Sequence, residues 1–361
     1  MRQPAVIGLD LGGTKLAGAV FGRRGRILHK TMAHLEGRKG RGVGALIRAE
    51  IRTLLEAAAK NGVPIAAIGV SVPGISYSKS GRVWAPNIPG WKNYPLRAEI
   101  EAALSDPLPS GRRQAHSSKR IIQSFATSAT PVRIAIDSDR VCYILGEAWQ
   151  GAAAGCKNAV FIAVGTGIGA GIMVDGQILR GAHDVAGAIG WLALDRPFRQ
   201  EYVQCGCFEY HASGAGLAKV AKQTLNQLTT KFRGASSQGD SGDATLHQSK
   251  EVTAQEIFSA YQRRDAIAIE VIAEAIQFWG MAVANLVSLL NPEKIIFGGG
   301  VFGPATQFLK DIQAEAKKWG QPISMKQVKL GVSKLGADAG LYGAGYLALE
   351  TSKLQKPISL Q

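Results

Sequence analysis

The sequence predicts an α/β protein made of two domains with the same plan. Short β-type runs alternate with helical stretches, which is typical of α/β domains. Two strands joined by a glycine-rich turn begin the chain, and the same pattern recurs at Asn158–Val174. Glycine is in excess: 44 of 361 residues, or about 12%, against roughly 7% in average proteins. Because these glycines follow no collagen period, we expect them in tight turns and where the backbone approaches a ligand.

The first part of the chain begins with three strands separated by glycine-containing turns. Two hairpins in succession predict an antiparallel start to a sheet. A helix with apolar residues three and four positions apart follows, and then a strand that is apolar enough to be buried. These predicted elements are the strands Val6–Asp10, Lys15–Phe21 and Arg26–Ala33, the helix Val43–Lys60 and the strand Ile65–Val72.

The second part of the chain repeats these patterns between two polar stretches. The stretches 105–130 and 228–249 have little periodicity and predict surface loops or insertions. Ser138 is placed to cap a helix that begins at Asp139. The predicted elements are the strand Val132–Asp137, the helix Asp139–Gln150, two strands within Asn158–Val174, a helical pattern over Thr253–Leu290, the strand Lys294–Phe297 and the closing helix Gly336–Glu350.

The composition excludes several classes of protein. Apolar residues at 46% and charged residues at 19% exclude wholesale disorder. Four cysteines make no disulfide framework in so long a chain, and the apolar runs fall short of the roughly 18–20 residues of a membrane span. We therefore expect a soluble cytoplasmic protein. The formal charge of +15 is interpreted as surface charge that helps to attract anionic molecules, with nucleic acid as the less favoured alternative.

Three glycine-rich strings open different α/β units. Two lie at strand-to-strand turns, and the third follows a buried strand: Asp10-Leu11-Gly12-Gly13-Thr14-Lys15, Gly165-Thr166-Gly167-Ile168-Gly169-Ala170-Gly171 and Gly298-Gly299-Gly300. Glycines let backbone N–H groups approach phosphate oxygens, and an aspartate at a strand end can hold Mg²⁺ or its water shell. Three glycines after a strand suit a flat ring such as adenine. Each string alone also fits an ordinary turn, but the three in this order indicate a nucleotide site.

Together the strings resemble the two phosphate elements and the adenosine element of the actin-like ATPase and sugar kinase fold, and within it the ROK (repressor, open reading frame, kinase) sugar kinases. The resemblance implies two actin-like, ribonuclease H-like domains with mixed sheets flanked by helices and an active site in the cleft between them. It places residues 1–136 with the closing helix 337–355 in one domain and residues 137–336 in the other. It covers nearly the whole chain, and the further matching strings are Val72-Pro73-Gly74, Asn87-Ile88-Pro89-Gly90-Trp91, Leu145-Gly146-Glu147, Gly206-Cys207-Phe208-Glu209 with Ser213, Asn291-Pro292 and Leu335-Gly336-Ala337-Asp338-Ala339-Gly340.

The resemblance also implies the site residues of a kinase that uses ATP and Mg²⁺. The family's catalytic base is the Asp of an Asn-Asp-x-Asn string that precedes Gly-Glu, which by counting back from Gly146 is Asp139, with Asp137 as its rival. The implied substrate-binding residues are Gly74, Asn87, Ser138, Asp139 and Glu209. The implied nucleotide-binding residues are Asp10, Gly12, Gly13, Thr14, Lys15, Gly165, Thr166, Gly167, Gly298, Gly299 and Gly300, and Asp10 is also the candidate Mg²⁺ ligand.

The chain departs from the family pattern at three places. Where the family has Gly-Glu-x-Gly-His, the chain has Gly187-Ala188-Ile189-Gly190-Trp191, so a sugar-binding Glu and a His that contacts sugar and zinc are absent. The family's cysteine run is reduced to Cys205-Gly206-Cys207, and these cysteines with His211 do not match zinc spacing, so we predict no structural zinc. Ser138 replaces an Asn and shortens a sugar-bonding arm.

For the residues near these departures, the sequence leaves two interpretations open. Trp191 either stacks on a sugar ring or fills the volume that the zinc lobe would occupy. His183 and Asp184 either replace the lost polar contacts or form an exposed pair in a loop.

We interpret the chain as an ATP-dependent hexose kinase that acts on a small-molecule sugar, with Asp139 as its base. The alternative is a non-catalytic sugar or nucleotide sensor that kept the fold. The family's repressors carry a helix-turn-helix before the first glycine string, which here begins at residue 10, so we expect no DNA-binding domain. We also expect a homodimer. The residues leave open which sugar and which hydroxyl react, and whether polyphosphate replaces ATP.

Overall fold

The computed structural model describes residues 4–105, 132–234 and 252–352, and the chain divides into two compact units. Unit 1 comprises residues 1–155, 178–186 and 334–361, and unit 2 comprises residues 156–177 and 187–333. The expected domain boundary after residue 136 differs from this division, because the helix that follows packs against the closing helix of unit 1.

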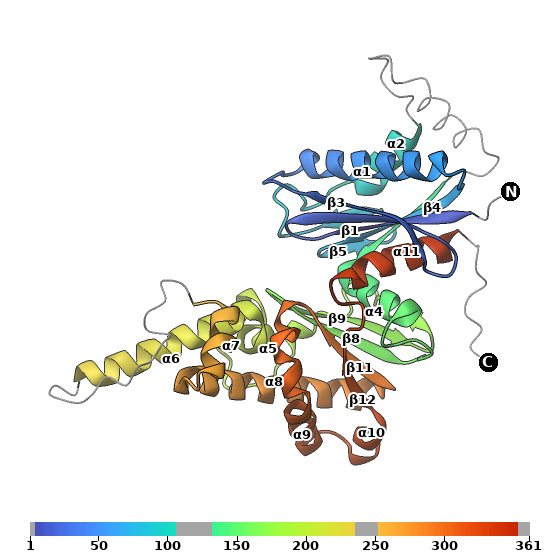
Figure 1. The fold of residues 1–361 in the computed structure, drawn as a ribbon. Helices are drawn as coiled ribbons and strands as arrows, with labels where there is room; N and C mark the ends of the chain where they lie inside the picture. The colour runs from blue at the N-terminus through green and yellow to red at the C-terminus, as the bar shows by residue number, and fades with distance from the viewer. Residues whose placement is uncertain (1–3, 106–131, 235–251, 353–361) are drawn as a thin grey trace. The chain divides into compact units, whose positions relative to one another are not determined.

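Unit 1 is built on a five-stranded sheet of order β3-β2-β1-β4-β7, with helices on both faces (Figure 1). β1, β2 and β3 are antiparallel, whereas β4 and β7 run parallel to β1. A separate hairpin pairs β5 with β6. The elements are β1 (Ala5–Leu11), β2 (Lys15–Phe21), β3 (Ile27–His34), α1 (Arg41–Lys60), β4 (Ile65–Val72), β5 (Ile75–Tyr77), β6 (Arg82–Trp84), α2 (Leu96–Ser105), β7 (Arg133–Ser138), α4 (Asp139–Gln150), the 3₁₀ helix η6 (Gly336–Asp338) and α11 (Ala339–Thr351).

The two faces of the unit 1 sheet bury different side chains. Successive residues of a strand point to opposite faces. Ile7 and Leu9 of β1 therefore pack in one cluster with Ile47 of α1, while Val6 packs in another with Leu341 of α11. Figure 1 shows α1 and α11 on opposite sides of this sheet.

α11 approaches its neighbours at backbone distance, and glycines make this approach feasible. An added Cβ at Gly69 of β4 would lie 1.9 Å from the carbonyl oxygen of Ala344, and one at Gly343 would lie 1.8 Å from that of Cys142 in α4. At Gly340 an added Cβ would lie 2.6 Å from the carboxylate of Asp10. The glycine excess therefore serves helix packing in addition to the turns and ligand contacts expected from the sequence.

Unit 2 repeats this plan, which confirms the predicted recurrence. Its sheet has the order β10-β9-β8-β11-β12, with β8 and β9 antiparallel and with β11 and β12 parallel to β8. The elements are β8 (Ala159–Val164), β9 (Ile168–Val174), β10 (Gln177–Ile178), the 3₁₀ helices η1 (Ile189–Trp191), η2 (Gln200–Gln204), η4 (Gly300–Phe302) and η5 (Pro304–Phe308), the helices α5 (Cys207–Ala212), α6 (Gly214–Gly234), α7 (Ala254–Gln262), α8 (Ala266–Leu290), α9 (Leu309–Trp319) and α10 (Pro322–Gln327), and the strands β11 (Lys294–Gly298) and β12 (Lys329–Val332).

The helix α8 forms the centre of the unit 2 core. Trp279, Val283 and Val287 of this helix are buried in the main cluster, and the Trp279 indole N–H donates to the carbonyl oxygen of Ala212 at 3.1 Å. Among the described residues, α8 is the one helix whose length and composition would allow it to span a membrane. The sequence predicted no membrane span, because the uninterrupted apolar runs are shorter than this helix. About half of the residues in the most apolar stretch of α8, 56%, are buried inside unit 2, which is typical of the core helix of a globular protein.

The local patterns of the sequence agree with the structure over most elements. β4 and α4 coincide with their predicted ranges, and the Ser138 hydroxyl caps α4 by accepting from the Val141 N–H at 3.4 Å. The helical pattern over Thr253–Leu290 divides in two, because Arg264 has a φ of 63° and Asp265 caps the start of α8. The first seven residues of the predicted insertion 228–249 belong to α6, and its residues 235–249 lie outside the described residues. Residues 106–130 of the predicted insertion 105–130 also lie outside the described residues.

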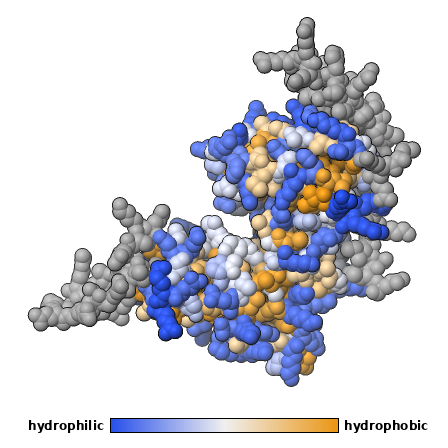
Figure 2. Space-filling view, in the orientation of Figure 1, coloured by the Kyte–Doolittle hydropathy of each residue, from blue (hydrophilic) through white to orange (hydrophobic). Residues whose placement is uncertain are grey.

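On the face shown in Figure 2, hydrophilic residues are spread over both units and are interspersed with smaller hydrophobic areas. No one part of that face is set apart by its hydrophilic residues.

The contact between α4 and α11 makes a prediction for stability. We expect Gly343→Ala to lower the free energy of unfolding by about 1–3 kcal/mol, because the methyl group would overlap the backbone of Cys142. Gly42→Ala is the matched control, since it also adds a methyl group to a helix but meets its nearest neighbour, Arg38, at 3.6 Å. Urea denaturation measures both, and a Gly343→Ala variant as stable as Gly42→Ala would contradict this packing.

Candidate functional site

Three polar side chains stand in register across the parallel strands of unit 1. Asp10 of β1 pairs with Ser71 of β4, and Ser71 pairs with Asp137 of β7. Each residue lies one position before the carboxyl end of its strand. This is the sheet edge at which open α/β sheets bind ligands. The first glycine string therefore starts at the edge where ligand chemistry is expected.

Asp10 is held in surroundings that disfavour its charge. Burial raises the pKa of its carboxyl to about 6; the Ser71 hydroxyl lowers it in part, and the charges of Asp139 and Asp338 add to the rise. The adjoining turn is closed by the Gly12 N–H, which donates to the Lys15 carbonyl oxygen at 2.9 Å. Gly13, Thr14 and Lys15 are exposed in this turn, so the turn is accessible to an anion.

Asp139 is the first residue of α4, where the positive end of the helix dipole favours a carboxylate. One of its oxygens accepts the Arg140 N–H at 2.8 Å. Burial nevertheless raises the pKa of Asp139 to about 6, against the lowering effects of the Arg140 charge and N–H group. The structure therefore places Asp10, Ser138 and Asp139 in the same unit, with Asp10 and Asp139 close enough for their charges to interact, whereas the sequence placed Asp10 in one domain and Asp139 in the other.

Asp137, the rival of Asp139, is already engaged by other groups. Its Oδ2 accepts from Arg180 Nη2 at 2.6 Å and Nε at 3.0 Å, and its Oδ1 accepts from the Ser138 N–H at 2.8 Å. Burial raises the pKa of Asp137, and Arg180 offsets part of this rise. Asp139, in contrast, forms no ion pair within the described ranges 4–105, 132–234 and 252–352. The geometry therefore distinguishes two acids that the sequence left as alternatives.

Gly74 and Asn87 lie in the loops that follow β4 and β6. Gly74 has a φ of 111°, and an added Cβ would lie 2.2 Å from the carbonyl oxygen of Trp84, so this position requires glycine for packing. Asn87 is exposed in a loop that is anchored by the buried Trp91, whose indole N–H donates to the Gly40 carbonyl oxygen at 3.0 Å. Sugar contacts by Gly74 and Asn87 stay a prediction.

In unit 2, hydrogen bonds with the helices α5 and α6 hold the turn between β8 and β9. The Gly165 carbonyl oxygen accepts from the Gly214 N–H at 2.8 Å, where α6 begins. The Glu209 carboxylate of α5 accepts from the Ile168 N–H at 2.6 Å, and burial raises its pKa while this N–H group lowers it. The sequence predicted Glu209 as a hydroxyl-binding residue; the structure adds that it holds the glycine hairpin in place.

The three glycines at the end of β11 and directly after it lie in different surroundings. An added Cβ at Gly298 would lie 2.3 Å from the Phe161 ring, and Gly299 has a φ of 90° and lies against the backbone of Val164. Gly300 faces open space. The structure therefore assigns packing to Gly298 and Gly299, whereas Gly300 lines a pocket of this unit.

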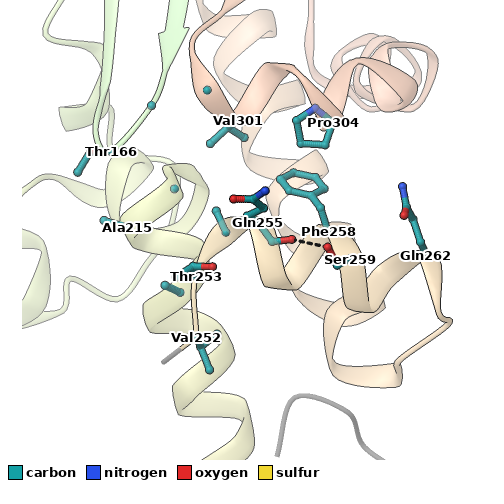
Figure 3. A pocket seen from close by; sticks show the side chains of 15 residues that line it. Thr166, Ala215, Val252, Thr253, Gln255, Phe258, Ser259, Gln262, Val301 and Pro304 are labelled. Atoms are coloured by element: carbon teal, nitrogen blue, oxygen red, sulfur yellow. Dashed lines mark hydrogen bonds between the residues drawn. The ribbon is translucent and has the colours of Figure 1, made fainter. Parts of the chain in front are cut away.

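A pocket of about 960 Å³ lies entirely within unit 2 (Figure 3). Its lining comes from the hairpin of β8 and β9, from the starts of α6 and α7, and from the segment after β11: Gly165, Thr166, Gly214, Ala215, Ala218, Val252, Thr253, Ala254, Gln255, Phe258, Ser259, Gln262, Gly300, Val301 and Pro304. None of these lining residues is ionisable. The pocket therefore suits a neutral, partly apolar group rather than a charged one.

Figure 3 shows the Gln255 side chain below Val301 and beside Phe258, above the start of α7. The Ser259 hydroxyl donates to the backbone carbonyl oxygen of Gln255 at 2.9 Å, and the Gln255 side chain lines the pocket. The glycine strings of the sequence indicated the hairpin and Gly300 as part of the nucleotide site, whereas the contribution of α7 was not predicted. The signal that was present is the Thr253 capping box with Glu256, which sets where α7 begins.

The region of the missing zinc ligands is held by a hydrogen-bonded network. His211 lies between the Tyr202 hydroxyl, 2.8 Å from Nε2, and the Glu274 carboxylate, 2.6 Å from Nδ1, and it stacks on Phe278. In the part of the chain that the structure describes, no group of three or more His, Cys, Asp or Glu side chains is placed to hold a metal. The absence of a structural zinc remains a prediction. Trp191 is 58% exposed, so it fills no core volume.

The sequence matches the ROK family model over residues 6–111 and 121–351. Glucokinase from Halalkalibacterium halodurans is 31% identical over 351 residues, which cover 94% of each chain. A xylose repressor from Caldicellulosiruptor bescii is 26% identical, over 94% of this chain and 76% of the repressor. The relatives therefore include both a kinase and a repressor.

Two solved structures share the fold over nearly their full length. A ROK hexokinase from Thermus thermophilus is 27% identical with a TM-score of 0.70, covering 97% of this chain and 100% of the hexokinase. A ROK family glucokinase from Streptomyces griseus, in complex with glucose and AMPPNP, is 25% identical with a TM-score of 0.66, covering 96% of this chain and 99% of the glucokinase. These similarities confirm the actin-like fold with mixed sheets flanked by helices.

Proposed function

Because this chain belongs to the ROK family, we propose that it is an ATP-dependent hexose kinase in which Asp139 is the catalytic base. The observation that carries the proposal is the arrangement at the start of α4. Asp137 is neutralised by an ion pair with Arg180, whereas Asp139 forms no ion pair among the described residues and keeps a pKa raised to about 6 despite the nearby Arg140 charge. A base is most effective when its pKa lies near the working pH. Asp139 therefore suits proton abstraction better than its neighbour.

In the proposed reaction, the carboxylate of Asp139 accepts the proton of the attacking sugar hydroxyl. The hydroxyl oxygen forms the new bond to the γ-phosphorus, and the bond to the β-γ bridging oxygen breaks to release ADP. Backbone N–H groups of the glycine turns at Gly12–Lys15 and Gly165–Gly167 stabilise the charge on the phosphates. Ser138 and Glu209, with Gly74 and Asn87, are the proposed sugar-binding residues.

The residues of unit 1 fit a magnesium ion. Asp10 shares its surroundings with Asp139 and Asp338, whose charges raise its pKa, and a cation would relieve this repulsion. Mg²⁺ usually takes one or two carboxylates and fills its shell with phosphate oxygens and water. Asp10 is therefore the residue proposed to hold Mg²⁺, directly or through water, and the ion when bound supplies neutralisation of the phosphate charge.

The pocket of unit 2 supports ATP as the phosphoryl donor. Its neutral lining suits a base and ribose, while Gly165 and Thr166 at its edge belong to the proposed phosphate turn. The Streptomyces griseus glucokinase carries an ATP analogue and glucose, which supports both substrate classes for this chain. Four free cysteines fit the reducing cytoplasm that we propose as its location. The homodimer stays a prediction.

A non-catalytic sensor is the second candidate function. It is favoured by Ala188 and Trp191, which replace a carboxylate and an imidazole of the family pattern and so remove two polar sugar contacts. The sensor would bind sugar or nucleotide without forming ADP. The two candidates therefore differ in a directly measurable product.

We expect Asp139→Asn to lower kcat by about 10²–10⁴-fold, because the amide cannot accept the proton. Burial raises the pKa of Asp139 in the folded protein, so the stability associated with its protonated form is lost as the pH rises through about 6. At neutral pH the variant should therefore unfold at the same or a higher temperature than the wild type. A coupled ADP assay and thermal unfolding measure both quantities.

Asp311→Asn is the matched control for this variant. Asp311 is an exposed acid in the first turn of α9, so its substitution tests the general effect of removing a charge from a helix N-terminus. It should keep the turnover of the wild type. Near-full turnover in Asp139→Asn would remove Asp139 from the mechanism.

The pH dependence of turnover gives a second test of Asp139. The ionised carboxylate is the active form, so we expect kcat to be constant above neutral pH and to fall as the pH drops through about 6. ATP and Mg²⁺ are kept saturating, so that changes in nucleotide affinity do not contribute, and circular dichroism at each pH verifies folding. A profile that stays flat to pH 5, as expected for an aspartate with the ordinary pKa of about 3.9, would contradict the raised pKa of the base.

The nucleotide pocket is tested by filling it. We expect Gly300→Leu to raise the KM for ATP by about tenfold or more, equivalent to about 1.4 kcal/mol, because the new side chain would enter the pocket. Gly331→Leu is the control, since an added Cβ there also meets open space but the residue lies on β12, away from the pocket lining. Equal KM values in the two variants would show that the pocket does not hold the donor.

A further inference from the structure

A short segment of unit 1, residues 178–186, is attached by two polar contacts and is called the strap here. Near one end, Arg180 donates two hydrogen bonds to Asp137 Oδ2, at 2.6 and 3.0 Å. Near the other end, Asp184 Oδ2 accepts from the N–H and the hydroxyl of Ser78, at 3.0 and 3.1 Å. The two attachments differ in where they act, because only that of Arg180 reaches the turn between β7 and α4.

Asp137 transmits the Arg180 contact to this turn. The residue is 8% exposed, and its two oxygens have separate partners: Oδ2 binds the guanidinium, and Oδ1 accepts the N–H of the next residue, Ser138, at 2.8 Å. A buried carboxylate whose cation is removed is strongly destabilised. The carboxylate of Asp137 would then turn toward water or take up a proton, and its hold on the Ser138 N–H would weaken.

The turn fixed in this way carries the base. Ser138 caps α4 through its hydroxyl, and Asp139 follows as the first helical residue. A displacement of Ser138 therefore moves the carboxylate of Asp139 directly. Errors of about 1 Å in the position of a reacting group can cost on the order of 10²-fold in rate.

We propose that Arg180 is a positioning residue for Asp139, acting through Asp137 and the Ser138 N–H. The inference rests on the proposed kinase function. Arg180 binds Asp137 and is not among the residues that line the nucleotide pocket of unit 2, so its loss should lower kcat and leave the KM for ATP unchanged. Arg180→Lys keeps the charge but offers no planar pair of N–H donors, so its kcat should lie between those of the wild type and Arg180→Ala.

The strap supplies its own control. Ser78→Ala removes the hydroxyl contact to Asp184 and leaves the Arg180 to Asp137 pair intact. Ser78→Ala keeps the N–H bond to Asp184, so if the strap acted only as a structural attachment, this variant would lower kcat in part. If Arg180 positions the base, Ser78→Ala should turn over at the rate of the wild type.

The experiment compares kcat and the KM for ATP of the wild type, Arg180→Ala, Arg180→Lys and Ser78→Ala. We expect Arg180→Ala to lower kcat by about tenfold to 10²-fold. Added guanidinium at millimolar concentration, but not sodium at equal ionic strength, should restore part of this loss by re-pairing Asp137. If circular dichroism shows that Arg180→Ala is not folded, the kcat of Arg180→Lys is compared with that of Ser78→Ala instead, and a lower kcat in Arg180→Lys alone supports the positioning role.

Three results would overturn the positioning role: an unchanged kcat in the Arg180 variants, a lower kcat in Ser78→Ala, or a rise in the KM for ATP without a fall in kcat. The failure of the proposed function is distinguishable from these results. Wild-type protein that forms no ADP with any hexose would contradict the kinase function itself, before the variants are compared.

Discussion

Unit 1 holds two like charges, Asp10 and Asp139, in surroundings that raise the pKa of each to about 6. At neutral pH both carboxylates therefore weaken the fold that contains them, since each is more easily ionised in the unfolded chain. The packing of α11 maintains this arrangement: Gly340 lies against Asp10, and Gly343 lies against the backbone of α4. The same packing brings the end of β1 and the start of α4 together. The burial of these two carboxylates lowers the stability of the fold, and the same burial gives Asp139 the raised pKa on which its proposed role as a base depends.

The neighbouring acids Asp137 and Asp139 show how one turn can separate two chemical roles. Asp137 ends a strand and points to a face where Arg180 neutralises it, whereas Asp139 begins a helix and keeps a proton affinity suited to a base. The two residues belong to the same short string, so the sequence favoured Asp139 by its spacing from Gly146 and kept Asp137 as a rival of the same residue type. The distinction depends on Arg180, which lies 43 positions along the chain from Asp137. A contact of that separation has no signature in the local sequence.

Local patterns predicted much of the fold, because periodicity and capping act within a few residues. β4, α4 and the Ser138 cap agree with the predicted ranges. Tertiary packing decided the rest. The glycines after β11 looked alike in the sequence, yet Gly298 accommodates Phe161 whereas Gly300 lines the pocket. Likewise, nothing in the polar sequence of α7 marked Gln255 as a pocket residue, since its role depends on α6 and β11 lying opposite.

The central claim, that the chain transfers phosphate from ATP to a hexose, is tested most directly by ADP formation. Purified wild-type protein is supplied with saturating ATP and Mg²⁺ and with a panel of hexoses, N-acylhexosamines and polyols, and ADP is measured with each acceptor and without one. The account predicts ADP formation that depends on at least one hexose and matches the sugar phosphate formed. Measurable ATP binding without ADP formation for every acceptor would contradict it and would favour a sensor on the same fold.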